Sequence, residues 1–140
     1  MNEVVVVRRV IPVPREEVFA AWLDAAAMTH WMLPGATTHS TIELDPRVGG
    51  KFRIVMSHGD RDYEHRGEYL AIEPPALLSF TWISPATDLQ PTIVTIELAD
   101  RDGGTELTLT HRNLPASKVE AHATGWTDIV RKLSEALMHA

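Results

Sequence analysis

The feature that most constrains the fold is a single long segment, near the end of the chain, with the spacing of an amphipathic helix. Ser117 and Glu120 have the spacing of a capping box, which predicts that the helix begins there. A helix of about 20 residues extends about 30 Å, the width of a small domain. One stripe of it is apolar on a helical wheel and consists of Val119, His122, Trp126, Val130, Leu133 and Leu137. Such a helix has to cover an apolar surface, and the rest of the chain must supply it.

The segment between residues 38 and 112 has the pattern of an antiparallel meander. Turn signals rich in glycine, proline and aspartate recur along it and separate short strand-like runs. In one of these runs Phe52, Ile54 and Met56 alternate with other residues, which is typical of a strand with one buried face. Glycines such as Gly67 are positions where a strand can bulge or bend, so the sheet is expected to curve.

The N-terminal part of the chain predicts a strand followed by two short helices. Residues 3–11 are rich in valine and are followed by two prolines that stop a strand. Residues 14–23 have apolar side chains four positions apart, and Asp24 can cap a second short helix that continues through Trp31. We therefore predict an α+β fold, in which a curved antiparallel sheet of about six or seven strands wraps around the long C-terminal helix. With no linker or repeat visible, residues 1–140 are expected to form a single domain.

Composition excludes several classes of function. The chain has 140 residues and a net charge of −6, with acidic and basic residues mixed, which argues against binding to nucleic acid or to anionic membranes. It contains no cysteine, and its 7 histidines have no tight ligand spacing, so no metal or other cofactor is expected. The apolar run at the start is too short for a signal peptide or a membrane span, and we expect a cytoplasmic protein.

A long helix rarely fits a curved sheet along its whole length, so the space between them is either filled by side chains or left as a pocket. The large residues expected to line such a cavity are Trp22, Trp31, Phe52, Ile54, Met56, Tyr69, Phe80, Trp82, Leu109, His111, His122, Trp126 and Ile129. Gly125, inside the helix, is expected to be a packing notch that brings the helix backbone close to a neighbouring element. Residues 84–92 contain two prolines and are expected to form a mobile rim outside the sheet.

The polar candidates are few. His111 and His122 have the inward parity of apolar elements, and two roles stay open for them: a structural histidine, or one that contacts a ligand or transfers a proton. His58 and His65 are expected to be solvated, as is Asp128 on the last helix. A solvated outer face with cross-strand pairs is predicted for Arg53, Glu64, Arg66 and Glu68. No nucleophile elbow, phosphate-binding loop or dinucleotide fingerprint occurs, so no catalytic residue is assigned.

Six stretches also carry a resemblance to a known family. They are PVPREEVFAAWLD, HWMLPG, LDPRVGGKFRIVM, GEYLAIEPPALLSFTW, GGTELTLTHRNLP and GWTDIVRKL. In this order they resemble the helix-grip fold of the START-like (SRPBCC) superfamily and, within it, the family of the activator of heat-shock protein 90 ATPase, C-terminal-domain type. The chain departs from the family pattern at Trp31-Met32, where a Trp–Trp pair is frequent, and at residues 47–50, where Arg-Pro-Gly-Gly is frequent.

The resemblance implies three functions. The first is non-catalytic binding of a small hydrophobic or aromatic molecule between the sheet and the last helix, which we favour. The second is a polyketide cyclase or dehydratase type of enzyme, in which His111, His122, Tyr63 or Tyr69 would act as acid or base. The third is an interaction module with a chaperone partner, the weakest of the three, because co-chaperones of this kind carry a further domain. A homodimer also stays open.

Overall fold

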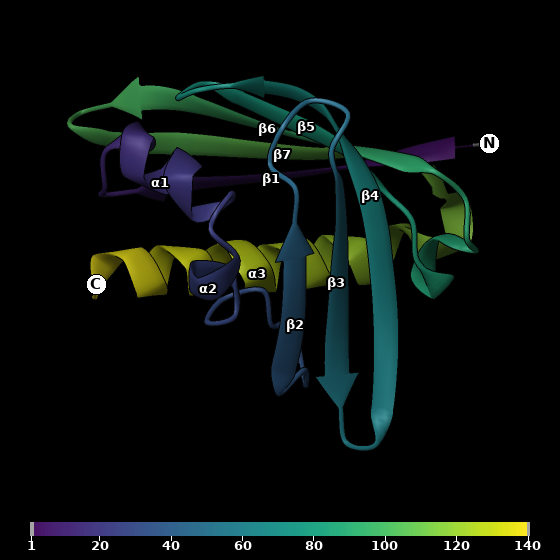
Figure 1. Cartoon of the computed structure of the whole chain (residues 1–140). Coiled ribbons are helices and arrows are strands. Elements are labelled where there is room, and N and C mark those ends of the chain that lie inside the picture. The colour runs from purple at the N-terminus through teal and green to yellow at the C-terminus, as the bar shows by residue number, and fades with distance from the viewer. Residues whose placement is uncertain (1, 140) are drawn as a thin grey trace.

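The computed structural model describes residues 2–139, and Figure 1 shows a sheet that curves around one long helix. Strands β2, β3 and the first part of β4 cross this helix, whereas β1 and β7 run along it. In chain order the elements are β1 (Asn2–Ile11), α1 (Arg15–Ala21), α2 (Ala25–Met28), β2 (His39–Leu44), β3 (Lys51–His58), β4 (Arg61–Glu73), β5 (Leu77–Trp82), the 3₁₀ helix η1 (Pro85–Thr87), β6 (Thr92–Arg101), β7 (Gly104–Pro115), the 3₁₀ helix η2 (Ala116–Lys118) and α3 (Val119–Met138).

The sheet has 7 strands in the order β1-β7-β6-β5-β4-β3-β2. Every pair is antiparallel, and all neighbours except β1 and β7 are consecutive in the chain. The predicted α+β class, the curved meander, the two short helices and the long last helix are therefore confirmed.

Strand β4 connects two differently oriented halves of the sheet. Its residues 61–68 pair with β3, and its residues 69–73 pair with β5, with a register shift between Tyr69 and Ala71. Gly67 lies just before this bend, and a Cβ built on it would be 2.0 Å from the Thr81 carbonyl oxygen and 2.2 Å from the Phe52 ring. Only glycine fits there, because the ring of Phe52 and the backbone of β5 both pack directly on this position.

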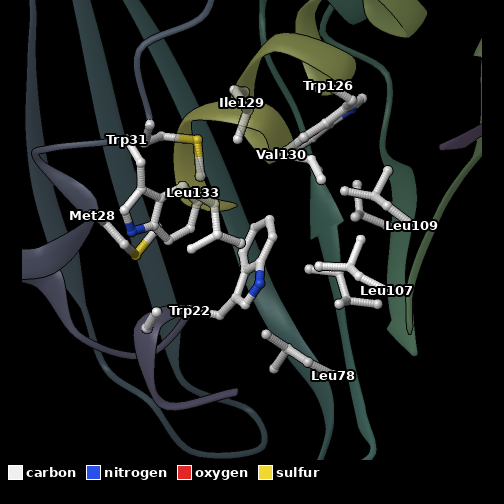
Figure 2. Close-up of a cluster of buried hydrophobic side chains, with 14 of the residues drawn as sticks. Trp22, Met28, Trp31, Leu78, Leu107, Leu109, Trp126, Ile129, Val130 and Leu133 are labelled. Atoms are coloured by element: carbon white, nitrogen blue, oxygen red, sulfur yellow. The ribbon is translucent and has the colours of Figure 1, made fainter. Parts of the chain in front are cut away.

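The core lies between the concave face of the sheet and α3. Trp126, Ile129, Val130 and Leu133 of the helix are all at most 3 % exposed. Figure 2 shows these four side chains pointing toward the strands and toward the short helices. The other side chains labelled there are Trp22, Met28, Trp31, Leu78, Leu107 and Leu109. The apolar stripe predicted from the wheel is thus the face that α3 buries.

Of the two helix caps predicted from the sequence, the structure confirms the one before α2 and contradicts the one before α3. The Asp24 carboxylate accepts from the backbone N–H of Ala27 and caps α2, as predicted, although α2 ends at Met28. The capping box predicted at Ser117 is wrong, because residues 116–118 form a 3₁₀ turn and α3 has no side-chain cap. A capping box occurs instead at η1, between Ser84 and Thr87.

The packing notch expected at Gly125 is also wrong. A Cβ built on this glycine would meet only the Pro34 Cβ, at 3.9 Å, which is ordinary van der Waals contact. The helix backbone therefore does not approach a neighbour closely at this point. Among residues 2–139, no helix is long and apolar enough to cross a membrane.

Candidate functional site

A cavity of about 180 Å³ lies between α3 and the bent part of the sheet. It forms where β4 leaves β5: Ile83 makes a single bridge to Arg66, and the chain then turns away into η1. The lining is mostly apolar and consists of Pro34, Met56, His65, Trp82, Ala86, Ala121, His122, Gly125, Trp126 and Ile129. An apolar cavity of roughly 150 Å³ can hold a benzene ring, so this space has the size of one small aromatic molecule.

The residues predicted for a cavity fall into three groups. Five of them line this one: Met56, Trp82, His122, Trp126 and Ile129. Another five, together with Trp82, surround a gap of only about 10 Å³, which is too small for a ligand: Trp22, Phe52, Ile54, Tyr69 and Phe80. Trp31, Leu109 and His111 line neither space, and the last two are completely buried. Under the first short helices the space between sheet and helix is therefore solid packing.

Five lining residues were not predicted from the sequence: Pro34, His65, Ala86, Ala121 and Gly125. His65 is the most important, because it was expected to be solvated and is instead 8 % exposed. Its ring lies 4.9 Å from that of Trp82. Strand parity contained the signal, since His65 has the same parity as the buried Tyr69.

His111 belongs to a chain of hydrogen bonds behind the cavity wall. The indole N–H of Trp126 donates to Nδ1 of His111 at 2.9 Å, and Thr92 Oγ1 lies 2.7 Å from Nε2 of His111. The Thr92 hydroxyl donates to the carbonyl oxygen of Trp82, so it accepts from His111. His111 is thereby neutral, with its proton on Nε2, and burial lowers its pKa to about 3. Because both ring nitrogens are occupied, the structural role is the one that this geometry supports.

His122 and His65 each use one ring nitrogen on a backbone carbonyl. Nδ1 of His122 donates to the carbonyl oxygen of Lys118 at 2.8 Å, one turn earlier in the helix, and Nδ1 of His65 donates to that of Ile54 at 3.3 Å. Burial lowers the pKa of both imidazoles, that of His65 to about 4. Both rings are therefore neutral near pH 7, with Nε2 unprotonated.

The two tyrosines considered as acid or base, Tyr63 and Tyr69, do not converge on the cavity. Tyr63 is 41 % exposed at the β3–β4 hairpin and does not line it. Tyr69 belongs to the packed region, where burial raises its pKa to about 12. No group of three or more histidine, aspartate or glutamate residues in the described part of the chain is placed to hold a metal ion.

The mouth of the cavity is formed by α3 and the segment before β2. A groove on the outer side of α3 shares Pro34, Ala121 and Gly125 with the cavity. Asp128 holds the segment in place, because its carboxylate accepts from the backbone N–H of Gly35 at 2.7 Å. Asp128 was expected to be only a surface residue, and this tether is a function that the sequence did not reveal.

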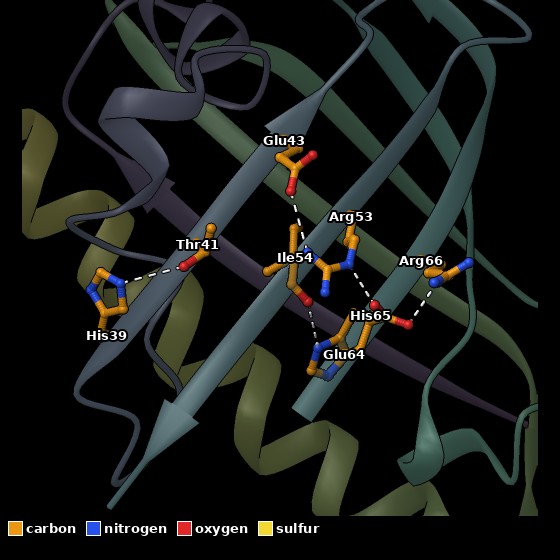
Figure 3. Close-up of polar contacts among 8 residues, drawn as sticks. All are labelled: His39, Thr41, Glu43, Arg53, Ile54, Glu64, His65 and Arg66. Carbon is orange, nitrogen blue, oxygen red and sulfur yellow. Dashed lines mark hydrogen bonds and ion pairs between the residues drawn. The ribbon is translucent and has the colours of Figure 1, made fainter. Parts of the chain in front are cut away.

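The outer face of the sheet is solvated, as predicted. Figure 3 shows Glu64 between two arginines, with ion pairs of 2.5 Å to Arg53 and 2.6 Å to Arg66. Hydrogen bonds from Arg66 and Arg53 lower the pKa of Glu64 to about 2. The same figure shows the ring of His65 bonded to Ile54, so neighbouring residues of β4 serve opposite faces of the sheet.

Several solved structures share the fold of this chain. Protein CV1439 from Chromobacterium violaceum matches with a TM-score of 0.83 at 23% identity, over 96% of each chain. Protein MLL2253 from Mesorhizobium loti matches with a TM-score of 0.80 at 26% identity, over 99% of this chain and 98% of that one. CalU16 from Micromonospora echinospora matches with a TM-score of 0.76 at 21% identity, over 97% and 76%. The shared architecture is the helix-grip fold.

The family is shown by the sequence itself. The model of the family described as activator of Hsp90 ATPase homolog 1-like proteins matches residues 12–138, and the chain belongs to this family. No curated protein sequence matches the chain. The resemblance drawn from the six stretches is thus confirmed.

Proposed function

We propose that this protein binds one small apolar or aromatic molecule in the cavity between the sheet and α3, without catalysing a reaction on it. The observation that carries the proposal is the cavity of about 180 Å³ with an apolar wall that includes Met56, Trp82 and Trp126. Transfer of an apolar ring from water to such a wall is favourable in proportion to the area that it buries. A cavity formed by rigid elements also lowers the entropic cost of holding the ligand.

The protonation states of the histidines support binding over catalysis. His111 has no free ring nitrogen, and a proton on Nδ1 would face the indole N–H of Trp126. His65 and His122 are neutral near pH 7 and so are poor proton donors, and their lowered pKa also makes them weaker bases than a free imidazole. What remains is a pocket with polar atoms that can orient a ligand.

The 4 tryptophans provide a direct test, because two line the cavity and two do not. When toluene or indole is added to labelled protein, we expect the indole N–H signals of Trp82 and Trp126 to shift in two-dimensional NMR spectra. The signals of Trp22 and Trp31 serve as internal controls and should stay in place. Four unchanged signals across a panel of single-ring probes, or equal shifts of all four, would rule out binding at this cavity.

A matched pair of variants at the mouth makes the test sharper. Gly125→Ala adds one methyl group with room around it, and Gly125→Leu adds a larger side chain beside Pro34. We expect the alanine variant to bind the probe like the wild type and the leucine variant to bind it at least tenfold more weakly. Equal affinity of the two variants would contradict a ligand route past Gly125.

A further inference from the structure

The polar atoms that line the cavity indicate which hydrogen-bonding groups its ligand should carry. His122 lines the cavity, and its Nδ1 hydrogen is already held by the carbonyl oxygen of Lys118. A neutral imidazole has only one N–H, so Nε2 carries a lone pair and can only accept. The bond to Lys118 is the side-chain hydrogen bond that the structure gives for His122 within residues 2–139. Nε2 is therefore a hydrogen-bond acceptor on a mostly apolar wall, and it is not among the fully buried atoms, so a ligand or solvent can reach it.

His65 also lines the cavity and also uses its Nδ1 hydrogen on the backbone. Its Nδ1 hydrogen is directed at the carbonyl oxygen of Ile54, and its ring stacks near Trp82 at 4.9 Å. The two imidazoles come from different elements, β4 and α3, and both line the cavity. Each uses its donor on the backbone, and the acceptor of His122 is the one that the helix presents to the cavity.

The charge of the cavity wall further restricts the class of ligand that can bind there. No lysine or arginine occurs among the residues that line the cavity, within the part of the chain that the structure describes. A carboxylate ligand would lose its hydration there and find no cation to pair with, which is strongly unfavourable. A neutral molecule with an O–H or N–H donor avoids the cost of burying an unpaired charge. Its donor can exchange a hydrogen bond to water for one to Nε2 of His122.

We propose that the ligand is a neutral single-ring aromatic molecule with a hydroxyl or ring N–H group, whose hydrogen is donated to Nε2 of His122. This inference rests on the proposed function and specifies its ligand class. The aromatic ring lies against Trp82 and Trp126, whose centroids are 5.0 Å apart, and the donor is directed at the histidine.

Three probes of nearly equal size test the proposal at pH 7.5: p-cresol, 4-methylanisole and 4-methylbenzoate. The methyl ether lacks the donor of the cresol but keeps its shape, and the benzoate adds a negative charge. In isothermal titration we expect p-cresol to bind roughly three- to tenfold more tightly than 4-methylanisole, as one neutral hydrogen bond gives. The benzoate should bind most weakly of the three. In ¹⁵N spectra, p-cresol should move the Nε2 resonance of His122 and the ether should not.

His122→Phe removes the acceptor and keeps a planar ring in its place. The variant should bind p-cresol and 4-methylanisole equally, with the ether bound as tightly as by the wild type. Equal affinity of the two probes for the wild-type protein would overturn the donor assignment while leaving the proposed binding function intact. If none of the three probes binds, the proposed function itself fails. His122 is not the acceptor if p-cresol still binds more tightly than 4-methylanisole to the variant and if p-cresol does not move the His122 Nε2 resonance of the wild type.

Discussion

The indole N–H of Trp126 donates to Nδ1 of His111 at 2.9 Å, and this bond joins α3 to β7 behind the wall of the cavity. The bond from His111 to Thr92 and the bond from Thr92 to the Trp82 carbonyl continue the chain into β6 and β5. Every member is buried, so none of these groups can replace a lost partner with bulk water. Trp126 is therefore fixed in orientation on one side while its ring lines the cavity on the other.

The first prediction concerns Thr92, near the end of this chain of hydrogen bonds. Thr92→Val keeps the shape of the side chain but leaves the Nε2 hydrogen of His111 and the carbonyl oxygen of Trp82 without their partner. A buried unpaired donor costs about 1–3 kcal/mol, and we expect the free energy of unfolding in urea to fall by that amount. Thr108→Val on the outer face is the control and should change stability by less than about 0.5 kcal/mol. Equal effects of the two variants would contradict a stabilising role for the hydrogen bonds of Thr92.

The second prediction is a loss of stability in mild acid. Burial lowers the pKa of His111 to about 3 and that of His65 to about 4, from an ordinary value of 6.5. Below pH 6.5 the unfolded chain binds protons at these positions and the folded chain does not. Stability is therefore complete above pH 6.5 and falls as the pH is lowered toward 4, by about 1.4 kcal/mol per pH unit for each imidazole.

Urea unfolding of the wild type at pH 7.5, 6 and 5 measures this slope. His111→Gln keeps a side chain that can accept and donate but does not titrate, so it should lose about 1.4 kcal/mol per pH unit of the slope. A wild-type stability that is constant from pH 7.5 to 5 would show that these histidines are not buried in their neutral form.

The third prediction compares two glycines. A Cβ at Gly67 would lie 2.0 Å from the Thr81 carbonyl oxygen, whereas a Cβ at Gly125 has only an ordinary contact. Gly67→Ala should therefore displace β5 or the ring of Phe52 and destabilise the fold by about 3 kcal/mol or more. Gly125→Ala should stabilise it by up to about 1 kcal/mol, because alanine is the better helix former. Thermal unfolding of both variants checks the opposite signs.

The fourth prediction concerns the segment at the mouth of the cavity. Asp128→Ala removes the acceptor of the Gly35 N–H and the ion pairs of Asp128 with Arg131 and Lys132. We expect the Gly35 amide to exchange its hydrogen at least tenfold faster, with a modest loss of global stability of about 1 kcal/mol. Glu135→Ala, which removes only an exposed partner of Arg131, is the control and should leave the exchange at Gly35 unchanged.

The fold could be predicted from the sequence because its signals are local. The spacing of Trp126, Val130 and Leu133 defines the buried face of α3, and the alternation of Phe52, Ile54 and Met56 defines that of β3. Both patterns depend only on the 3.6-residue and 2-residue periods of helix and strand. The helix start was missed because three residues of 3₁₀ turn precede α3, and this depends on how β7 leads into it.

The cavity could be predicted only in part, because packing between distant segments decides where space remains. Whether Phe52 fills a gap or borders one depends on the rings of Phe80 and Tyr69, which come from other strands. Parity did indicate that His65 faces inward, but its polarity favoured a solvated position. The Asp128–Gly35 bond joins residues 93 positions apart, and no local pattern encodes it.

The pairing of β1 with β7 has a consequence for the order of assembly. It is the one ladder that joins distant parts of the chain, with Asn2 opposite Pro115, whereas the other strands pair with their successors. Five consecutive ladders can close through short connections, but this one must bring together ends separated by most of the polypeptide, at a larger loss of chain entropy. The N-terminal strand is therefore expected to dock late in refolding, and its deletion would leave the outer edge of β7 open to other chains.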